Sequence, residues 1–353
     1  MPRMNDPWRS YRLPAAGERL SEYREPLPEP KDAEVLVRIT ASGVCHSDVH
    51  FRDGYFDLGH DRKADLTRGM KLPLTMGHEI FGEVVAAGPQ ARDAKPGDRR
   101  IVYPWIGCGE CDNCKAGLEH LCVGKSRILG LNLNGGFSTH VLVPHERYLV
   151  DAGSIADTIA CTFACSGLTA FGALKKADAG PLLIVGAGGV GLAAVRMASS
   201  FLGRAPFVAD IDPAKREAAI AAGAQRAFDP REPDAAKQVL KATGGGAATA
   251  IDFVGAPSST QFAMQSVRRA GRIVVVGLFG GSLDLSLPLL PLRSITLQGS
   301  YVGSLAELQE LVAMARAKGV PEIPVQLRAL EAAQESLDDL QAGRVLGRVV
   351  LQP

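Results

Sequence analysis

The sequence predicts an α/β chain of two domains, one built mostly of β-strands and one built around a doubly wound parallel sheet. Its 353 residues are enough for two separate hydrophobic cores. Residues 34–150 contain short apolar runs separated by glycine and proline, whereas from residue 181 compact apolar strands alternate with helix-like segments. The first pattern is typical of a small sheet or barrel, and the second of a parallel sheet covered by helices on both faces.

Four of the seven cysteines lie in one loop of the first domain, CGECDNCKAGLEHLC. Their C-x2-C-x2-C-x7-C spacing lets a short loop wrap around one tetrahedral ion. Four thiolates leave no coordination position open, so the pattern predicts a structural zinc site rather than a catalytic one. The predicted ligands are Cys108, Cys111, Cys114 and Cys122, in a lobe of about residues 105–124.

The three other cysteines are Cys45, Cys161 and Cys165. Cys45 begins CHSDVH, and His78 follows in GHEIFG; with one more thiolate they would form the open three-ligand site that catalytic zinc requires. Cys161 and Cys165 are four residues apart, so both lie on one face if their segment is helical. Spacing does not choose between them, and a closed site that uses both is the alternative.

A glycine-rich turn opens the second domain. The segment LLIVGAGGVGLAAV places Gly186, Gly188 and Gly191 in a G-x-G-x-x-G pattern, after an apolar strand and before an alanine-rich helix. The glycines allow a tight turn, close approach of a pyrophosphate to backbone N–H groups, and close packing of helix on strand. This context predicts a dinucleotide site.

Two aspartates compete for the ribose of that dinucleotide. Asp210 ends the next strand, at the spacing after Gly191 that suits a carboxylate on the adenosine ribose. Asp212 precedes Pro213 and is interpreted as the N-cap of the following helix. A carboxylate at Asp210 would repel a 2′-phosphate, so the sequence favours NAD over NADP.

The end of the chain is expected to form an amphipathic helix, LAELQELVAMARAKG, and a strand, VLGRVVLQP, that returns to the first domain. The 39 basic and 38 acidic residues form no basic block, which disfavours nucleic-acid and membrane partners. MPRMNDPWRS lacks a signal-peptide pattern, and no apolar run reaches the roughly 18 residues of a spanning helix. A soluble, cytoplasmic protein is therefore expected.

The motifs GVCHSD, GHEIFGEV, the four-cysteine loop, ACSGLTAF, VGAGGVG and GRVVL resemble, in order and approximate spacing, the zinc-containing medium-chain alcohol dehydrogenases. The stretch between Cys45 and His78 is most similar to microbial NAD-dependent, usually tetrameric members. The resemblance implies a GroES-like β-barrel catalytic domain, residues 1–163 and 304–353, and a Rossmann NAD-binding domain, residues 164–303. It also implies a homotetramer or homodimer, and the strand around RSITLQGSY is a candidate for pairing with a second copy.

The resemblance further implies two zinc ions per chain and assigns the catalytic ion to Cys45, His78 and Cys165, with Cys161 left as packing. Glu79 then resembles the carboxylate beside this zinc, and Asp48 the residue that orients His78. Ser47 and His50 match a proton relay that runs through the nicotinamide ribose.

The remaining implied roles concern cofactor and substrate. Besides the glycine motif and Asp210, the expected cofactor contacts are His46, Thr169, Gly189, Val190, Lys215, Leu278 and Arg348. Trp105 and Phe56 are expected to line the substrate pocket, with Leu278 as a further apolar wall. His60, His140 and His145 match no functional position and are expected to be structural or exposed.

The implied function is reversible, NAD-linked oxidation of primary or secondary apolar alcohols, medium-chain or aromatic, to aldehydes or ketones. Zinc would polarise the alcohol oxygen, the proton would leave through Ser47, the ribose and His50, and hydride would pass to nicotinamide C4. The alternative is a zinc-stabilised, NAD-binding sensor without turnover. Such a protein would be expected to lack part of the ligand set or relay, and this sequence keeps both.

Overall fold

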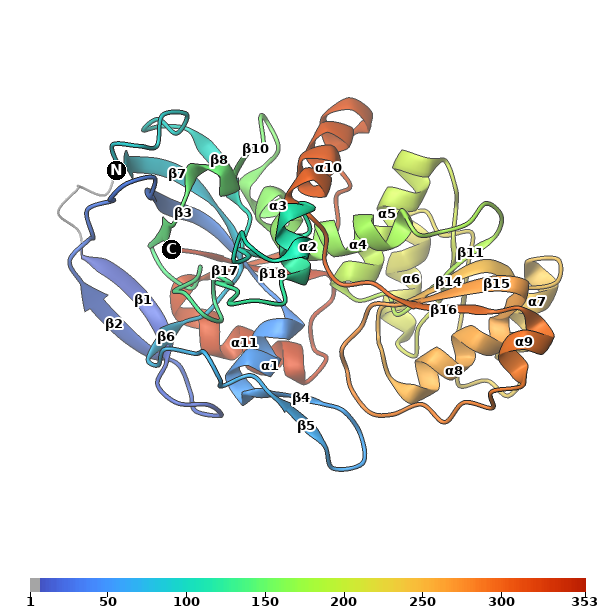
Figure 1. Ribbon diagram of the computed structural model, residues 1–353. Coiled ribbons are helices and arrows are strands. Elements are labelled where there is room, and N and C mark those ends of the chain that lie inside the picture. The colour runs from blue at the N-terminus through green and yellow to red at the C-terminus, as the bar shows by residue number, and fades with distance from the viewer. Residues whose placement is uncertain (1–6) are drawn as a thin grey trace.

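The computed structural model describes residues 7–353, which form two lobes joined by helical segments (Figure 1). Residues 1–6 lie outside the described residues. They make up most of MPRMNDPWRS, the segment in which no signal peptide is expected. Strands from both ends of the chain build one lobe, and the middle of the chain builds the other.

The first lobe is built on a seven-stranded sheet in the order β10-β8-β7-β3-β18-β17, with β9 also paired to β3. The last strand, β18, pairs antiparallel with β3, so the chain end returns to this lobe as expected. Small additional sheets are formed by β2-β1-β6 and β4-β5. The strands are β1 (Trp8–Leu13), β2 (Ser21–Glu25), β3 (Val35–Val44), β4 (Tyr55–Asp57), β5 (Lys63–Asp65), β6 (Leu74–Thr75), β7 (Glu79–Ala87), β8 (Arg99–Val102), β9 (His140–Val143), β10 (Leu149–Asp151), β17 (Val325–Ala329) and β18 (Arg348–Gln352).

Short helices flank these strands and place polar residues at their ends. The first, α1 (His46–Asp53), follows β3 directly and stops at Gly54, whose φ of 81° is the left-handed conformation that glycine adopts without strain. The other short helical segments are α2 (Asp112–Lys115), η1 (Glu119–Leu121), η2 (Glu146–Tyr148), η4 (Leu330–Ala332) and α11 (Ala333–Gln341).

The second lobe contains a six-stranded, wholly parallel sheet in the order β13-β12-β11-β14-β15-β16. Counted within the lobe, the order is 3-2-1-4-5-6, the doubly wound arrangement in which a ligand binds outside the carboxyl ends of the central strands. The strands are β11 (Leu182–Val185), β12 (Phe207–Ala209), β13 (Arg226–Phe228), β14 (Ala247–Asp252), β15 (Val267–Val275) and β16 (Thr296–Gly299). The helices are α5 (Gly189–Leu202), α6 (Pro213–Ala221), α7 (Ala235–Ala242), α8 (Pro257–Ser266) and α9 (Leu289–Arg293).

A nearly continuous helical segment connects the lobes: α3 (Asp157–Thr162), the π-helical η3 (Phe163–Gly167) and α4 (Leu168–Leu174). It crosses the predicted domain boundary at residue 163 without a break. The segment is long and apolar enough to span a membrane, but 83% of it is buried inside the protein, as in the core helix of a globular fold.

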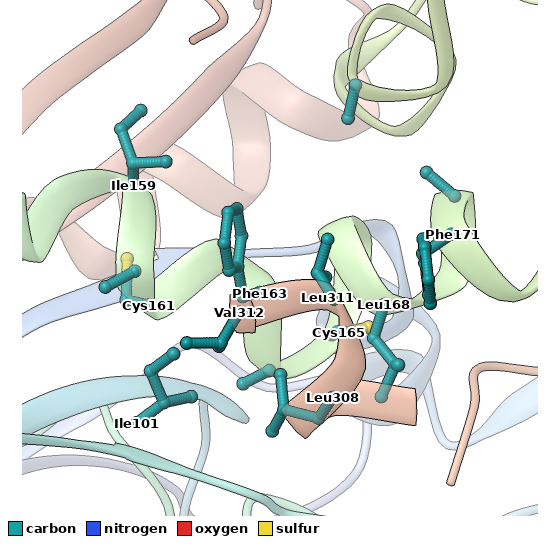
Figure 2. Close-up of a cluster of buried hydrophobic side chains, with 14 of the residues drawn as sticks. Ile101, Ile159, Cys161, Phe163, Cys165, Leu168, Phe171, Leu308, Leu311 and Val312 are labelled. Atoms are coloured by element: carbon teal, nitrogen blue, oxygen red, sulfur yellow. The ribbon is translucent and has the colours of Figure 1, made fainter. Parts of the chain in front are cut away.

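The helix α10 (Leu305–Lys318) packs against this connecting segment and closes the core between the lobes. Ser304 caps its first turn, since the Ser304 hydroxyl accepts a hydrogen bond from the Glu307 amide. Figure 2 shows the resulting apolar contact between the two helical segments, formed by Phe163, Leu168, Phe171, Leu308, Leu311 and Val312. This packing holds η3 rigidly next to β7.

Candidate active site and metal centres

The first candidate centre is a buried group of three ligating side chains from three separate elements. Cys45 is the N-cap of α1, His78 directly precedes β7, and Cys165 lies within η3. Their ligand atoms all lie within 4.8 Å of one another. A π turn inside an α-helix is frequent at functional positions, and here it carries the third ligand.

The second cysteine of the helical segment lies outside this group. Cys161 is fully buried, and its Sγ contacts the carbonyl oxygen of Thr158 at 3.5 Å, one turn back along its own helix. Figure 2 shows the two thiols well apart along the helical segment, with the Cys165 thiol beside Leu168. The structure thus brings together a three-ligand set, not the closed four-ligand alternative.

The ring of His78 is oriented for a metal. Its Nδ1 lies 2.8 Å from Asp48 Oδ1, and both side chains are fully buried. The other carboxylate oxygen of Asp48 accepts a hydrogen bond from the Cys45 amide. The remaining ring nitrogen, Nε2, is buried and has no hydrogen-bond partner among residues 7–353. A buried nitrogen of this kind is costly unless it binds something, so the residues fit a zinc ion held by two thiolates and this imidazole.

Charge interactions within the group agree with ligation. The neighbouring Cys165 thiol, together with His78, holds the pKa of Cys45 well below its usual range. Burial opposes protonation of His78, but the Asp48 carboxylate outweighs it and raises the pKa of that imidazole. The site therefore favours a thiolate, the form that binds metal, at Cys45, whereas contact with Cys45 and burial raise the pKa of Cys165.

Glu79 joins the metal group to the dinucleotide side of the protein. Its carboxylate is fully buried; Oε1 accepts a hydrogen bond of 3.0 Å from the Ser166 amide in η3, and Oε2 forms an ion pair with Arg348. Burial raises the pKa of Glu79 even though Arg348 lies beside it. The side chain of Arg348 in turn packs directly against Gly189, where a Cβ atom would overlap it. The residue expected at the pyrophosphate is thus at the glycine turn, with its charge directed to Glu79.

The four loop cysteines form the second candidate centre. The Sγ atoms of Cys108, Cys111, Cys114 and Cys122 all lie within 4.8 Å of one another. Backbone N–H groups lower the pKa of Cys111 to about 6, a thiolate-favouring environment. Gly107 and Gly124 pack directly against the sulfur atoms of this group, so a side chain at either position would collide with a ligand. The cysteine spacing alone did not reveal the need for these two glycines.

The glycine turn has the shape of a phosphate cradle. Gly186 has a φ of 89°, and a side chain on Gly191 would overlap the Gly186 carbonyl oxygen, so both positions require glycine. Gly188 faces open space. The helix α5 begins at Gly189 and continues through Val190, so its first N–H groups point to that space.

The two competing aspartates have different partners. Asp212 is the N-cap of α6, and its Oδ1 accepts a hydrogen bond of 2.9 Å from the Ala214 amide. Asp210 is almost fully buried at the end of β12, and its Oδ2 accepts a hydrogen bond of 2.7 Å from the Ala187 amide in the glycine turn. Asp210 is therefore the carboxylate that lies beside the cradle.

The predicted relay and pocket residues gather around α1. Ser47 and His50 are half-buried and lie three positions apart on this helix, on one face. The His50 ring lies 4.9 Å from that of Phe56, centroid to centroid, and burial lowers the pKa of His50. Thr169 is half-buried within the otherwise buried α4.

Trp105 is buried with its ring 5.5 Å from that of His78, and its Nε1 donates to the Ala164 carbonyl oxygen. Tyr301, which the sequence did not single out, packs edge-on against Trp105 at 5.6 Å. Desolvation raises the pKa of the Tyr301 hydroxyl, and the nearby Cys165 and Cys45 thiols raise it further. Its only sequence signal is its place directly after an apolar strand of the parallel sheet.

The remaining expected cofactor contacts lie on the solvent side. His46 and Leu278 are exposed and Lys215 is half-buried. Desolvation lowers the pKa of the His46 imidazole, and the charge of Arg348 acts in the same direction. His60, expected to be structural or exposed, is exposed at the turn between β4 and β5, and its Nε2 lies 2.8 Å from Ser282 Oγ of the other lobe.

Comparison with known proteins agrees with this geometry. The Alcohol dehydrogenase GroES-like domain family matches residues 31–153, and the Zinc-binding dehydrogenase family matches residues 189–317. The chain is 35% identical over 350 residues to an NAD-dependent alcohol dehydrogenase of Sulfurisphaera tokodaii, covering 98% of this chain and 100% of that protein. It is 30% identical over 351 residues to a D-arabinose 1-dehydrogenase (NADP(+)) of Saccharolobus solfataricus, covering 95% and 96%.

Among solved structures, an alcohol dehydrogenase from Aeropyrum pernix superposes with a TM-score of 0.86 at 29% identity, covering 98% of this chain and 100% of that one. The similarity extends over both lobes, and the cysteine, histidine and glycine motifs that carry the resemblance occupy the two candidate centres and the cradle. This chain belongs to the zinc-containing medium-chain alcohol dehydrogenase family, with a GroES-like domain and a Rossmann domain.

Proposed function

We propose that this protein catalyses the reversible oxidation of primary or secondary apolar alcohols to aldehydes or ketones, with NAD as the hydride acceptor. One observation carries the proposal: Nε2 of His78, which has no hydrogen-bond partner in the described part of the chain, lies with Cys45 and Cys165 in a buried three-ligand set. The Glu79–Arg348 pair links this set to the glycine turn. Metal group and dinucleotide cradle are thereby parts of one site.

Two groups that the structure does not contain would supply the central chemistry: a zinc ion, which Cys45, His78 and Cys165 would hold, would act as a Lewis acid toward the substrate oxygen, and NAD would accept the hydride. The protein's own residues prepare this step. Asp48 holds His78 in position through Nδ1, and Ser47 and His50 form a path for the alcohol proton away from the substrate. Burial lowers the pKa of His50 and so favours its neutral imidazole, the form that can accept a proton.

The walls around the metal group support an apolar substrate. Trp105, Tyr301 and Phe56 present aromatic surface next to His78 and His50. Each methylene group that a substrate packs against such a wall contributes about 1–3 kcal/mol of binding free energy. The wall therefore favours medium-chain or aromatic alcohols over polar ones. It does not by itself separate primary from secondary alcohols.

The test is steady-state kinetics on primary, secondary and aromatic alcohols with NAD and with NADP, followed by NADH absorbance. Turnover that rises with apolar chain length supports the proposal. Absence of NADH with every alcohol in zinc-loaded protein would overturn it and favour a binding role without turnover.

A matched pair of cysteine variants tests the ligand set. Cys165→Ala should abolish turnover and lower the zinc content by one ion per chain, while NAD still binds. Cys161→Ala, one turn away in the same buried segment, should keep both zinc ions and most activity. The reverse pattern would move the assignment to Cys161. Metal analysis of the wild type should give two zinc ions per chain, the second in the four-cysteine lobe.

The proposal includes a homodimer or homotetramer located in the cytoplasm. The edge strand β16 and the neighbouring α9 expose apolar side chains, among them Leu297, Leu289 and Leu292. An exposed edge with apolar side chains favours pairing with a second copy. Light scattering should show an oligomer, and Leu292→Glu should weaken it; a monomeric wild type would contradict this part.

A further inference from the structure

Two arginines lie next to the aspartate expected at the adenosine ribose. Arg216 of α6 donates from Nη1 to the carbonyl oxygen of Asp210 at 2.7 Å. Arg231, beyond β13, donates from Nη2 to the carbonyl oxygen of Ile211 at 2.8 Å. Both guanidinium groups are therefore fixed to the short segment that follows β12, where a cofactor's ribose would lie.

One carboxylate holds both arginines. Asp229 follows β13 directly, and its Oδ2 lies 3.2 Å from Arg216 Nη1 and 2.6 Å from Arg231 Nη2. Its Oδ1 also accepts from Arg231 Nε at 2.9 Å. The strand ends are neighbours, because the Asp210 amide donates to the Phe228 carbonyl oxygen at 3.2 Å. Two aspartates thus stand side by side at the ends of adjacent parallel strands.

We propose that Asp229 is a second determinant of the preference for NAD over NADP, because it keeps Arg216 and Arg231 in ion pairs and away from a 2′-phosphate. The inference rests on the proposed use of NAD. In residues 210–217 and 229–232 five carboxylates outnumber three cations; the carboxylates are Asp210, Asp212, Glu217, Asp229 and Glu232, and the cations are Lys215, Arg216 and Arg231. A phosphate carrying about two negative charges meets no excess of positive charge there.

Removing Asp229 changes both the charge and the freedom of the guanidinium groups. Arg231 is well exposed, with 64% of its side chain accessible, and would be free to turn toward a phosphate. Arginine binds phosphate through paired, charge-assisted hydrogen bonds. Removal of Asp210 alone would remove one source of repulsion toward the 2′-phosphate but would leave both arginines in their ion pairs with Asp229. Substitutions of Asp210 and Asp229 are therefore expected to reinforce each other.

The test compares binding of adenosine 2′,5′-bisphosphate and 5′-AMP to the full-length protein by calorimetry, and kcat/KM for NADP and NAD. Asp229→Asn should raise the affinity ratio of bisphosphate over AMP about tenfold at low salt, with a smaller gain at high salt. Asp229→Ser should give the same shift. Adding Arg231→Ala to Asp229→Asn should remove most of the gain, since the freed cation is then missing.

The chain contains a matched control in the first lobe. Asp339 also pairs with two arginines, Arg328 at 2.8 Å and Arg344 at 2.6 Å, and its side chain is 17% accessible against 14% for Asp229. Asp339→Asn therefore removes an equivalent charge from an equivalent pair of partners and should leave both ratios unchanged.

An unchanged ratio in Asp229→Asn, or equal weakening of both ligands, would overturn the role of Asp229. A shift of the same size in Asp339→Asn would also overturn it, because overall charge would then be the cause. If the wild type bound neither 5′-AMP nor NAD, the proposed cofactor itself would fail, and this inference with it.

Discussion

Replacement of Glu79 by glutamine tests how the buried ion pair holds the site together. The amide side chain of Glu79→Gln keeps an oxygen for the Ser166 amide but removes the negative charge beside Arg348. Arg348 is only 4% exposed, and its Nε already has no hydrogen-bond partner among the residues that the structure describes, so its charge would stay buried without compensation. Removing one partner of such a buried ion pair lowers the free energy of unfolding by about 3–5 kcal/mol.

A second pair on the same strand gives the reference value. Glu83 of β7 pairs with Arg38 of β3, but about a third of each side chain is accessible to solvent. Because water screens this pair, Glu83→Gln should cost only about 0–1 kcal/mol. The measurement is urea unfolding of both variants and of the wild type, prepared without chelator and followed by circular dichroism.

A double variant separates charge from packing. Glu79→Gln with Arg348→Met removes both charges and keeps the acceptor for Ser166, so it should be less destabilised than the sum of the single variants. Equal destabilisation by Glu79→Gln and Glu83→Gln, or strict additivity in the double variant, would refute the reasoning that the buried charge pair is the important feature.

Three further predictions follow from individual contacts. Asp48→Asn should weaken zinc binding at the His78 centre about 10–100-fold in a chelator competition, because the carboxylate that orients His78 is lost. The four-cysteine lobe should keep its ion. Unchanged zinc affinity at the His78 centre would contradict the orienting role of Asp48. Burial lowers the pKa of His140 to about 4, so between pH 6.5 and about 4 the unfolded chain binds a proton that the folded chain does not, and stability falls as the pH falls. His140→Gln should therefore lose about 2–3 kcal/mol less than the wild type across that range, measured by urea unfolding at each pH; identical pH profiles would count against it. Asp212→Ala should lower the free energy of unfolding by about 1 kcal/mol through loss of the α6 cap, with the preference for NAD retained; a relaxed preference would transfer the ribose role to Asp212.

The sequence by itself determined the features that depend on local spacing. The glycine turn is such a feature, because the conformations of Gly186 and Gly191 are imposed within a few residues of chain. The four-cysteine loop is another, since short spacings limit how far apart the thiols can lie. The alternation of apolar strands and helices likewise predicted the parallel sheet, whose order then follows the doubly wound pattern.

Only the tertiary structure decided which groups from distant segments meet. Cys161 and Cys165 have equivalent helical spacing, and the resemblance to a family, not the periodicity, favoured Cys165. In the folded chain the π turn of η3 and the packing of α10 place Cys165 against Cys45 and His78. Side-chain direction at a local distortion depends on contacts that lie far away in sequence, so spacing cannot supply it.

The same reason explains the contacts that the sequence missed. Glu79 and Arg348 are 269 positions apart, and Tyr301 reaches the metal group from the opposite lobe. Asp229, Arg216 and Arg231 come together because two strand ends are neighbours in the parallel sheet. Each contact is formed when the burial of apolar faces brings sheets and helices together, and that step is not encoded in any single stretch of the chain.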